Sequence, residues 1–178
     1  MRPNRKLKVE CFVDADFAGL CGAENPEDPI SVKPRTGFLI KFSRCFLLWV
    51  SKLQIEVALS TLHSEYVALS QSLRDLLPTK ELLKDTISNV GIPEDCLKFK
   101  TKCTVFEDNA GALQVATSPR MTPTSKFIAV KYHWFRQHVD SGEINIVKVT
   151  SQEQQADMFT KGLQGELFRK IRKLVCGW

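Results

Sequence analysis

Residues 11–19, CFVDADFAG, place two aspartates at the end of an apolar run. The first three residues have the composition of a buried strand, and Gly19 indicates a turn soon afterwards. A carboxylate at the buried end of a strand costs free energy unless its charge is compensated. Because side chains alternate along a strand, Asp14 shares a face with Phe12 and is expected at the rim of the sheet. We expect Asp16 to lie on the turn beyond the strand. The stretch therefore predicts an acidic site at a strand end.

The rest of the chain alternates between strand-like and helix-like segments. Strands are expected over residues 8–13, 36–43, 45–50, 103–108 and 144–149, and helical segments over 61–77, 80–90, 109–116, 128–139 and the last twenty or so residues. Ser43 and Arg44 lie between two apolar runs and predict a hairpin. Pro78 is expected to break or kink the long helix, and the Gly91-Ile92-Pro93 sequence to end it. This order predicts an α/β fold with a mixed sheet, an antiparallel meander joined to parallel strands, and helices packed on it.

Composition limits the class of protein. The chain has 178 residues, 43% of them hydrophobic and 25% charged, which is typical of one soluble globular domain. We expect a basic lead-in over residues 1–8 and a single domain over 9–178. The six cysteines form no C-x-x-C pair, which favours reduced thiols over a disulfide or zinc framework. The longest apolar run, residues 45–50, is too short to span a bilayer, and the basic start lacks the apolar core of a signal peptide.

Positive charge is unevenly placed along the chain. The net charge is +5, yet no acid occurs between Asp28 and Glu56 or between Asp108 and Asp140. The basic residues of these stretches and of the tail are Lys33, Arg35, Lys41, Arg44, Lys52, Arg120, Lys126, Lys131, Arg136, Arg169, Lys170, Arg172 and Lys173. Such stripes suit a polyanion such as nucleic acid. A solvated surface with uneven charge is the alternative, and charge alone does not separate the two.

Three further acids occupy positions comparable to that of Asp14. Asp108 closes the expected fourth strand, and sites in open α/β sheets lie outside the carboxyl ends of parallel strands. Glu65 lies at the edge of the apolar face of the long helix, and Asp157 opens a later helix. Each has an ordinary explanation by itself: a solvated boundary position for Glu65, a helix-dipole contact for Asp157, and a helix cap for Asp108 with Asn109. Together they predict a site for a divalent cation, which would relieve the repulsion between them.

Several blocks carry a resemblance to a known family. VDADFAG, RTGFLI, WVSKLQIEVALSTLHSEYVALSQ, EDNAGAL, SKFIAVKYHWFRQHV, GEINIVKV and QQADMFTKGL occur in this order over nearly the whole chain beyond residue 8. In this combination the chain resembles the ribonuclease H domain of copia-type LTR retrotransposon polyproteins. The resemblance implies the ribonuclease H-like fold, a five-stranded mixed sheet flanked by helices. It also implies that Asp14, Glu65, Asp108 and Asp157 are the catalytic carboxylates and hold two Mg²⁺ ions, with Mn²⁺ as a possible substitute.

The implied activity is hydrolysis of the RNA strand of RNA–DNA hybrids. Mg²⁺ prefers carboxylate, water and phosphate oxygens, and two ions roughly 4 Å apart can activate a water and stabilise the leaving oxygen. The resemblance further implies a reverse transcriptase domain upstream, which this chain lacks, and an intracellular place, in a cytoplasmic particle or the nucleus, without a membrane partner. The expected nucleic-acid contacts are Lys33, Arg35, Lys52, Asn109, Arg120, Lys126, Lys131, His133 and Arg136.

The chain also departs from the family pattern. His63 stands where the family often has an acid, and Thr124 and Phe127 replace an expected cation and an expected imidazole. These departures affect substrate grip or turnover and leave the predicted fold unchanged. A catalytically decayed or domesticated remnant that binds nucleic acid without turnover is therefore the alternative to the enzyme. A structural interaction domain without a nucleic-acid role is disfavoured by the acid-free basic stretches.

Overall fold

The computed structural model describes residues 8–17, 30–91, 103–118, 128 and 130–178. Its strands are β1 (Val9–Asp16), β2 (Arg35–Phe42), β3 (Cys45–Leu53), β4 (Cys103–Glu107) and β5 (Ile144–Lys148). Its helices are α1 (Thr61–Val90), α2 (Ala110–Thr117), α3 (Arg136–Asp140) and α4 (Gly165–Cys176), with short 3₁₀ helices η4 (Val130–Tyr132) and η5 (Gln155–Phe159).

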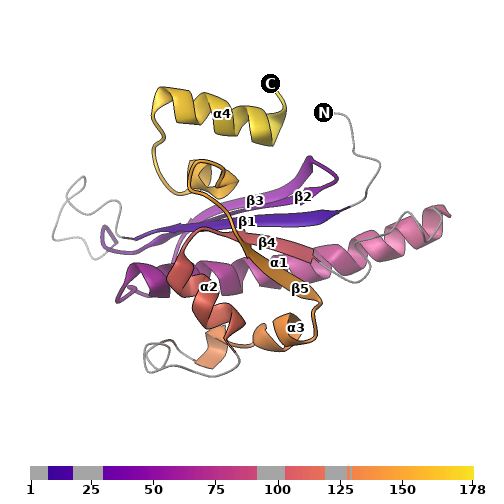
Figure 1. The fold of residues 1–178 in the computed structure, drawn as a ribbon, viewed down its shortest axis with the longest axis horizontal. Helices are drawn as coiled ribbons and strands as arrows, with labels where there is room; N and C mark the ends of the chain where they lie inside the picture. Colours follow the sequence, from indigo (N-terminus) through magenta and orange to yellow (C-terminus); the bar gives the residue numbers. More distant parts are fainter. Residues whose placement is uncertain (1–7, 18–29, 92–102, 119–127, 129) are drawn as a thin grey trace.

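The five strands form one mixed sheet in the order β3-β2-β1-β4-β5 (Figure 1). The first three strands are an antiparallel meander, whereas β1 pairs with β4, and β4 with β5, in parallel. The predicted hairpin between β2 and β3 is present, with Ser43 at φ 50° and Arg44 at φ 76°. Both values are in the left-handed region that two-residue hairpins require. The predicted mixed sheet is therefore confirmed, and β1 lies at its centre.

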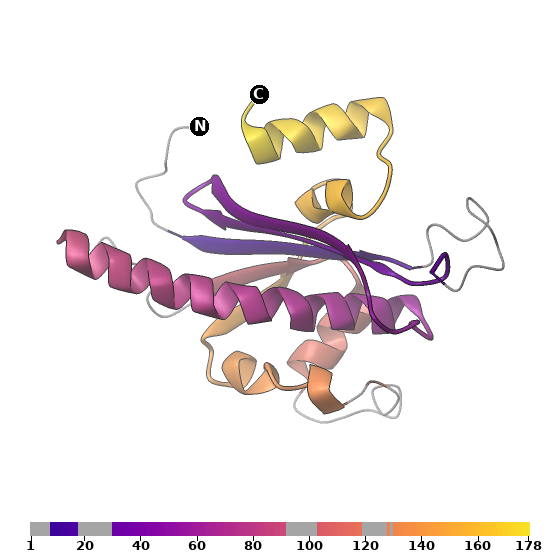
Figure 2. The same ribbon diagram turned by 180° about the vertical axis from the view of Figure 1, so that it is seen from behind.

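Helices cover both faces of the sheet (Figures 1 and 2). Cys11 and Val13 of β1 face α1, where they join a core with Tyr66 and Leu69. Phe12 faces the other way, toward a smaller core under η5 and α4. This alternation follows from the two-residue period of a strand whose both faces are covered. Among the described helices, none is long and apolar enough to cross a membrane.

Two helix predictions need correction. α1 runs for 30 residues and includes Pro78, so the expected break does not occur. Pro78 is exposed, and the carbonyl of Arg74 that loses its hydrogen-bond donor can therefore be hydrated. The predicted end is confirmed, because Gly91 caps the helix at φ 74°. The single helix expected over 128–139 is wrong as well: this segment holds η4 and the start of the short helix α3.

Two features of the strands also differ from expectation. β1 continues through Asp16, which pairs with Arg35 of β2, so Asp16 is not on a turn. The antiparallel partner extends the strand past the point at which composition suggested an end. Trp49, within the apolar run 45–50, is nevertheless 54% exposed, because β3 is an edge strand and this residue lies on an open hollow beside Phe46 and Met158.

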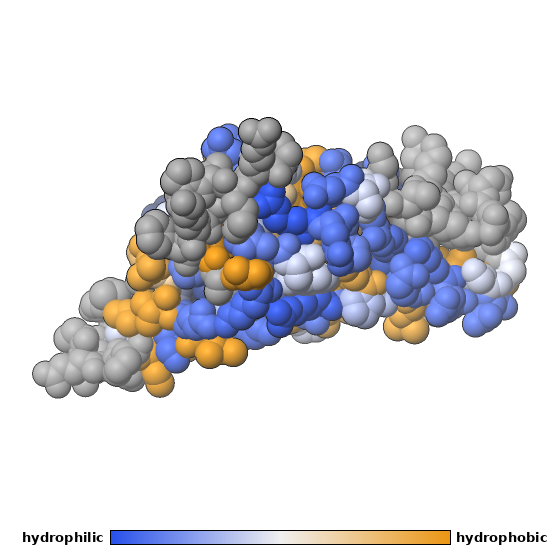
Figure 3. All heavy atoms as spheres, turned by 90° about the horizontal axis from the view of Figure 1, so that it is seen from below, coloured by the Kyte–Doolittle hydropathy of each residue, from blue (hydrophilic) through white to orange (hydrophobic). Residues whose placement is uncertain are grey.

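The face below the sheet is formed mainly by α1, α2 and α3. Figure 3 shows this face, where hydrophilic side chains separate the hydrophobic ones into small groups. Scattered apolar residues of this kind are ordinary on a soluble surface. Among the described cysteines, Cys11 and Cys103 are buried and Cys45 and Cys176 are partly buried; the reduced state stays a prediction.

Candidate active site

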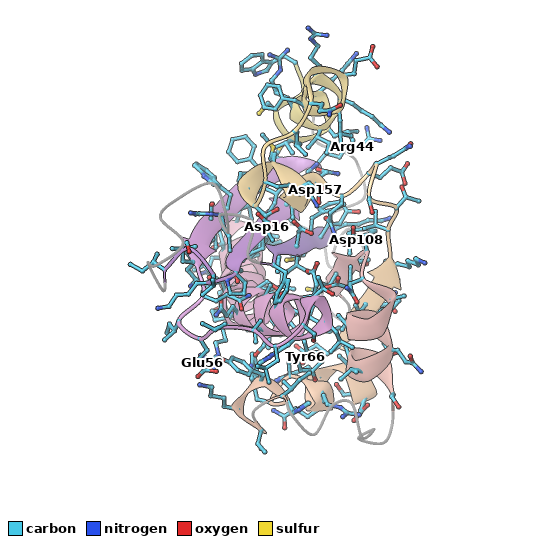
Figure 4. All side chains as sticks on the ribbon, turned by 90° about the vertical axis from the view of Figure 1, so that its left-hand side faces the viewer. Asp16, Arg44, Glu56, Tyr66, Asp108 and Asp157 are labelled. Atoms are coloured by element: carbon cyan, nitrogen blue, oxygen red, sulfur yellow. The ribbon has the colours of Figure 1, made fainter. Side chains whose placement is uncertain are left out.

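Three of the predicted carboxylates converge at the carboxyl end of the central strands. Asp14 comes from β1, Glu65 from α1, and Asp108 from the residue after β4. One oxygen of each lies within 4.8 Å of one oxygen of each of the others. Figure 4 looks at this end of the sheet, with Asp108 and Asp16 near the strand ends and Asp157 on η5 above them. These three carboxylates are far apart in the sequence, yet they lie close enough together that one cation could contact all of them.

Strand register explains the meeting of Asp14 and Asp108. The parallel pairs of β1 and β4 include Phe12 with Phe106, so the two aspartates follow two residues later on neighbouring strands. Phe12 and Phe106 themselves stack at 4.4 Å between ring centroids. Ser60 caps the start of α1 by accepting a hydrogen bond from the backbone N–H of His63, which fixes where the helix begins. Glu65 then follows one turn into the helix and is only 6% exposed.

The ammonium of Lys161 links Asp157 to the three-carboxylate group. The carboxylate of Asp157 forms an ion pair with the ammonium of Lys161 at 3.1 Å, and the same ammonium lies 3.7 Å from Asp14. Asp157 does not belong to the three-carboxylate group, although it is 2% exposed and close enough to Asp14 to affect its charge. Sequence reasoning missed Lys161, although its position four residues after Asp157 on a helical segment is a spacing that favours such a pair.

The seat of η5 on the sheet depends on Gly37. This residue pairs with Asp14 across β1 and β2, and a Cβ built on it would lie 2.5 Å from the Thr160 side chain and 3.0 Å from Phe159. The close approach lets the Thr160 hydroxyl donate a hydrogen bond to Asp14. Gln154 adds a second tie, donating to the carbonyl of Val13 at 2.8 Å. Gly37 therefore lets η5 pack closely against β2, a role that its place in the RTGFLI block did not indicate.

The electrostatics of the site disfavour several negative charges at once. Burial, reinforced by Glu107 and Asp14, raises the pKa of Glu65 to about 11. Burial also raises the pKa of Asp14, against the effect of Lys161, and raises the pKa of Asp157 to about 7. The Oε2 atom of Glu65 is buried and has no hydrogen-bond partner among the described residues. A carboxylate oxygen in this condition beside two other carboxylates fits a hard divalent cation, for which oxygen ligands are preferred.

Glu107 is a further acid that sequence reasoning missed. It is fully buried, and its Oε1 accepts a hydrogen bond from the backbone N–H of Asn109 at 3.0 Å. Burial raises its pKa well above the usual value, with Asp108 and Asp14 acting in the same direction. The signal was present in the sequence, because Glu107 alternates with Cys103 and Val105 and therefore shares their core-facing side.

Comparison with known proteins addresses the fold and the ancestry of the chain. No model of a known protein family matches it. The fold is similar to that of solved structures. RNase H1 from Halobacterium salinarum has a TM-score of 0.51 at 13% identity, with coverage of 86% of this chain and 94% of that one. LC11-RNase H1 from compost has a TM-score of 0.56 at 17% identity, with coverage of 86% and 92%. The N-terminal RNase H domain of a Mycobacterium tuberculosis protein has a TM-score of 0.51 at 14% identity, with coverage of 94% and 98%.

The chain has the ribonuclease H-like fold. Its homologues are retrovirus-related Pol polyproteins from transposons. This chain is 30% identical over 164 residues to the Pol polyprotein from transposon TNT 1-94 of Nicotiana tabacum. It is 25% identical over 175 residues to the Pol polyproteins from transposons RE1 and RE2 of Arabidopsis thaliana. These alignments cover 92% and 98% of this chain, but the chain spans only 11% of the length of each polyprotein.

In this ribonuclease H-like fold, the predicted nucleic-acid contacts that the structure describes fall into two groups. Lys33, Arg35, Lys52 and Asn109 lie toward the same end of the molecule as the carboxylates, since Arg35 pairs with Asp16 and Asn109 follows Asp108. Arg35 donates to Ser51 at 3.3 Å, and Asn109 caps α2 by accepting from the backbone N–H of Ala112. Their roles stay predictions.

The second group already has partners within the protein. Lys131 pairs with Glu56, and Arg136 donates to the carbonyl of Ser118. The Nδ1 atom of His133 lies 2.8 Å from the Tyr66 hydroxyl, beneath α1. Arg120 and Lys126, together with the departures Thr124 and Phe127, lie outside the described residues. His63 accepts a hydrogen bond from the backbone N–H of Leu59 at 3.3 Å.

Proposed function

We propose that this chain is a divalent-metal-dependent ribonuclease that hydrolyses the RNA strand of RNA–DNA hybrids. The observation that carries the proposal is the convergence of Asp14, Glu65 and Asp108 within 4.8 Å, with a buried oxygen of Glu65 that has no hydrogen-bond partner in the described part of the chain. The ribonuclease H-like fold supports it. The homologues support a place within a copia-type retrotransposon polyprotein, downstream of a reverse transcriptase domain, with residues 9–178 as one ribonuclease H domain.

The four carboxylates would hold the cations in this mechanism. Asp14, Glu65 and Asp108 are the proposed ligands of one shared site, with Asp157 as the fourth carboxylate, and two bound Mg²⁺ or Mn²⁺ ions would supply the activated water and stabilise the 3′ oxygen as it leaves. Thr160 and Lys161 orient Asp14 and Asp157, because each contacts at least one of these carboxylates. The products would be a 5′-phosphate and a 3′-hydroxyl. Selection of RNA would rest on contacts to its 2′-hydroxyl.

The test is cleavage of a hybrid labelled on each strand in turn. The purified chain should cut the RNA strand in Mg²⁺ or Mn²⁺, leave the DNA strand intact, and stop in EDTA. Asp108→Asn should lower the rate by roughly 10²-fold or more, which corresponds to about 2.7 kcal/mol of lost transition-state stabilisation. Asp140→Asn, an exposed substitution of the same kind on α3, is the matched control. Equal rates for the two variants would contradict the proposal.

A nucleic-acid-binding module without turnover is the second candidate. The observation that favours it is the position of Lys161, whose ammonium already lies 3.1 Å from Asp157 and 3.7 Å from Asp14 and compensates part of their charge. Such a module would bind the hybrid in EDTA but leave the RNA strand intact in Mg²⁺ and in Mn²⁺. Binding and cleavage measured on the same preparation therefore separate the two candidates.

A further inference from the structure

Lys41 is a buried cation whose hydrogen-bond partners are neutral. It lies on β2 and is 5% exposed, and its ammonium donates to Oε1 of Gln155 at 2.9 Å and to the carbonyl of Leu174 at 3.0 Å. The ion pairs recorded among the described residues do not include it. A buried charge is costly unless it is compensated, and neutral oxygens compensate an ammonium less than an anion does. The ammonium therefore has unused capacity to bind an anion.

The surroundings of Lys41 are positively charged. It borders a cavity of about 610 Å³ between the sheet and α4, which is also lined by Arg44, Lys170 and Lys173. Glu10 is the one carboxylate among the lining residues. Arg44 occupies a left-handed hairpin position, φ 76°, where glycine or asparagine is usual, so a cation is held here at a conformational cost. Four cations against one carboxylate make this cavity suited to an anionic ligand.

A second cavity lies between this one and the carboxylates and shares a lining residue with it. A cavity of about 1020 Å³ is lined by Asp157 and Lys161 at one end, and Lys170 lines both cavities. Glu166, Lys170, Lys173 and Gly177 are spaced by four, three and four residues and so form one stripe along α4 and its cap. Figure 2 shows α4 lying along the sheet above η5, in the direction of the strands. Because Lys170 lines both cavities, they adjoin along α4, and we refer to the two together as the groove.

We propose that this groove, bordered by Lys161, Lys170, Lys173, Arg44 and Lys41, binds the phosphodiester backbone of a nucleic-acid strand beyond the cleavage point. The inference rests on the proposed function, since the strand would be that of the hybrid. Asp14 and Glu10 are four residues apart on β1, or about 13 Å, which equals the rise of roughly four base pairs along the axis of a duplex. Across both cavities six cations face three acids, Glu10, Asp157 and Glu166, so the lining has a net positive charge that suits a phosphate backbone.

Binding measured in EDTA tests the groove apart from turnover. Fluorescence anisotropy of a labelled 18-base-pair hybrid is followed against salt concentration for the wild type and for Lys173→Gln, Lys41→Met and Arg74→Gln. Arg74 is the matched control, because it is an exposed cation on α1, on the opposite side of the sheet. Lys173→Gln and Lys41→Met should each weaken binding roughly threefold to tenfold and lower the salt slope by about one, and Arg74→Gln should do neither.

Each other outcome has a defined meaning. If Lys173→Gln and Lys41→Met bind as the wild type does while the wild type cleaves hybrid in Mg²⁺, the groove inference fails and the proposed function stands. If the wild type binds through these lysines without cleaving, the inference stands and the enzyme proposal fails. An equal loss of binding to hybrid and to a poly-glutamate peptide would overturn the assignment to nucleic acid. Lys173 is exposed, so its variant decides the matter even if Lys41→Met fails to fold.

Discussion

Asp14 is a buried carboxylate whose negative charge is only partly compensated within the protein. It is 2% exposed, and burial raises its pKa in spite of the nearby ammonium of Lys161. Asp108 acts in the same direction through its negative charge. Replacing the carboxylate by an amide of the same shape removes this conflict and removes a proposed cation ligand at the same time.

We therefore expect Asp14→Asn to raise the melting temperature in EDTA by several degrees, and to abolish the further rise that Mg²⁺ gives the wild type. Thermal melts followed by circular dichroism, with and without Mg²⁺, measure both effects. Asp16→Asn is the control, since it lies on the same strand and face but outside the three-carboxylate group. If Asp16→Asn abolished the Mg²⁺ effect and Asp14→Asn preserved it, the assignment of the ligand would be wrong.

At the scale of residues, the sequence predicted chemical types better than contacts. Asp14, Glu65 and Asp108 could be found because each stands at a strand end or on a helix edge, and their convergence follows from sheet geometry. The spacing of Lys161 from Asp157 favours their ion pair, but the contacts of Lys161 and Thr160 with Asp14 depend on how η5 packs on β2 and could not be predicted. Asp16 was misplaced because the length of β1 is determined by its pairing with Arg35, which composition does not show.

At the scale of elements, η5 on β2 is the contact that positions Asp157. Gly37→Ala would place a methyl group 2.5 Å from Cγ2 of Thr160, with the backbone carbonyl of Ala156 at 3.2 Å. Because η5 must move to relieve this overlap, we expect a loss of roughly 1–3 kcal/mol in the free energy of unfolding and a fall in hybrid cleavage. Urea unfolding and the cleavage assay measure the two effects.

Gly165→Ala provides the comparison for Gly37→Ala, since a Cβ there meets no heavy atom within 4 Å. It should leave stability within about 0.5 kcal/mol of the wild type and leave cleavage unchanged. A similar loss in both variants would mean that the effect of Gly37→Ala does not come from the contact with η5.

Pro78 is a second element-scale feature with a measurable effect. It lies at an exposed position inside α1, where it removes one backbone hydrogen bond. Pro78→Ala should therefore raise the free energy of unfolding by about 1–3 kcal/mol without changing cleavage. Urea unfolding tests this, provided that the m-value, the slope of the free energy of unfolding against urea, is the same for the variant and the wild type. A destabilised variant would indicate that the proline fits a bend on which the packing of α1 depends.

Helices and strands were predicted correctly where the local sequence pattern and the tertiary packing favour the same structure. The strands and the hairpin at Ser43 and Arg44 were recognised from apolar runs and their spacing. The long helix was expected to break or kink at Pro78 because proline removes a backbone hydrogen bond, whereas packing of α1 along β1 and β2 outweighs that loss and the helix continues. The segment 128–139 has helical spacing, but its side chains are fixed by contacts such as that of His133 with Tyr66, and only short helical turns form.

At the scale of the whole molecule, the pKa shifts predict how stability depends on pH. The folded pKa values of Asp14, Glu65, Glu107 and Asp157 are all raised, to about 7 for Asp157. Above about pH 4 the unfolded chain releases protons that the folded chain retains, so the free energy of unfolding should fall as pH rises. Hydrogen bonds to lysines lower the pKa values of Glu56 and Glu143, so the gain in stability from ionising these two carboxylates occurs mainly below about pH 5.

We thus expect the melting temperature in EDTA to fall between pH 5 and pH 8, with Mg²⁺ reducing the fall by compensating the carboxylates. Among the described groups, His63 opposes the trend in this window, because burial lowers its pKa. Calorimetry over the pH series, with and without Mg²⁺, measures the difference. Stability in EDTA that increases from pH 5 to pH 8 would contradict the burial of these acids.

The order of strands across the sheet has a consequence for synthesis of the chain. β1, made first, lies between β2 and β4, and β4 in turn needs β5 on its other side. A nascent chain that has emerged only as far as α1 can complete the meander but leaves one edge of β1 open. Asp157 takes its place beside Asp14 only after residue 157 has left the ribosome, about nine-tenths of the way along this chain. Pairing between distant segments is slow, so the packing of η5 on the sheet determines when Asp157 first lies beside the other carboxylates.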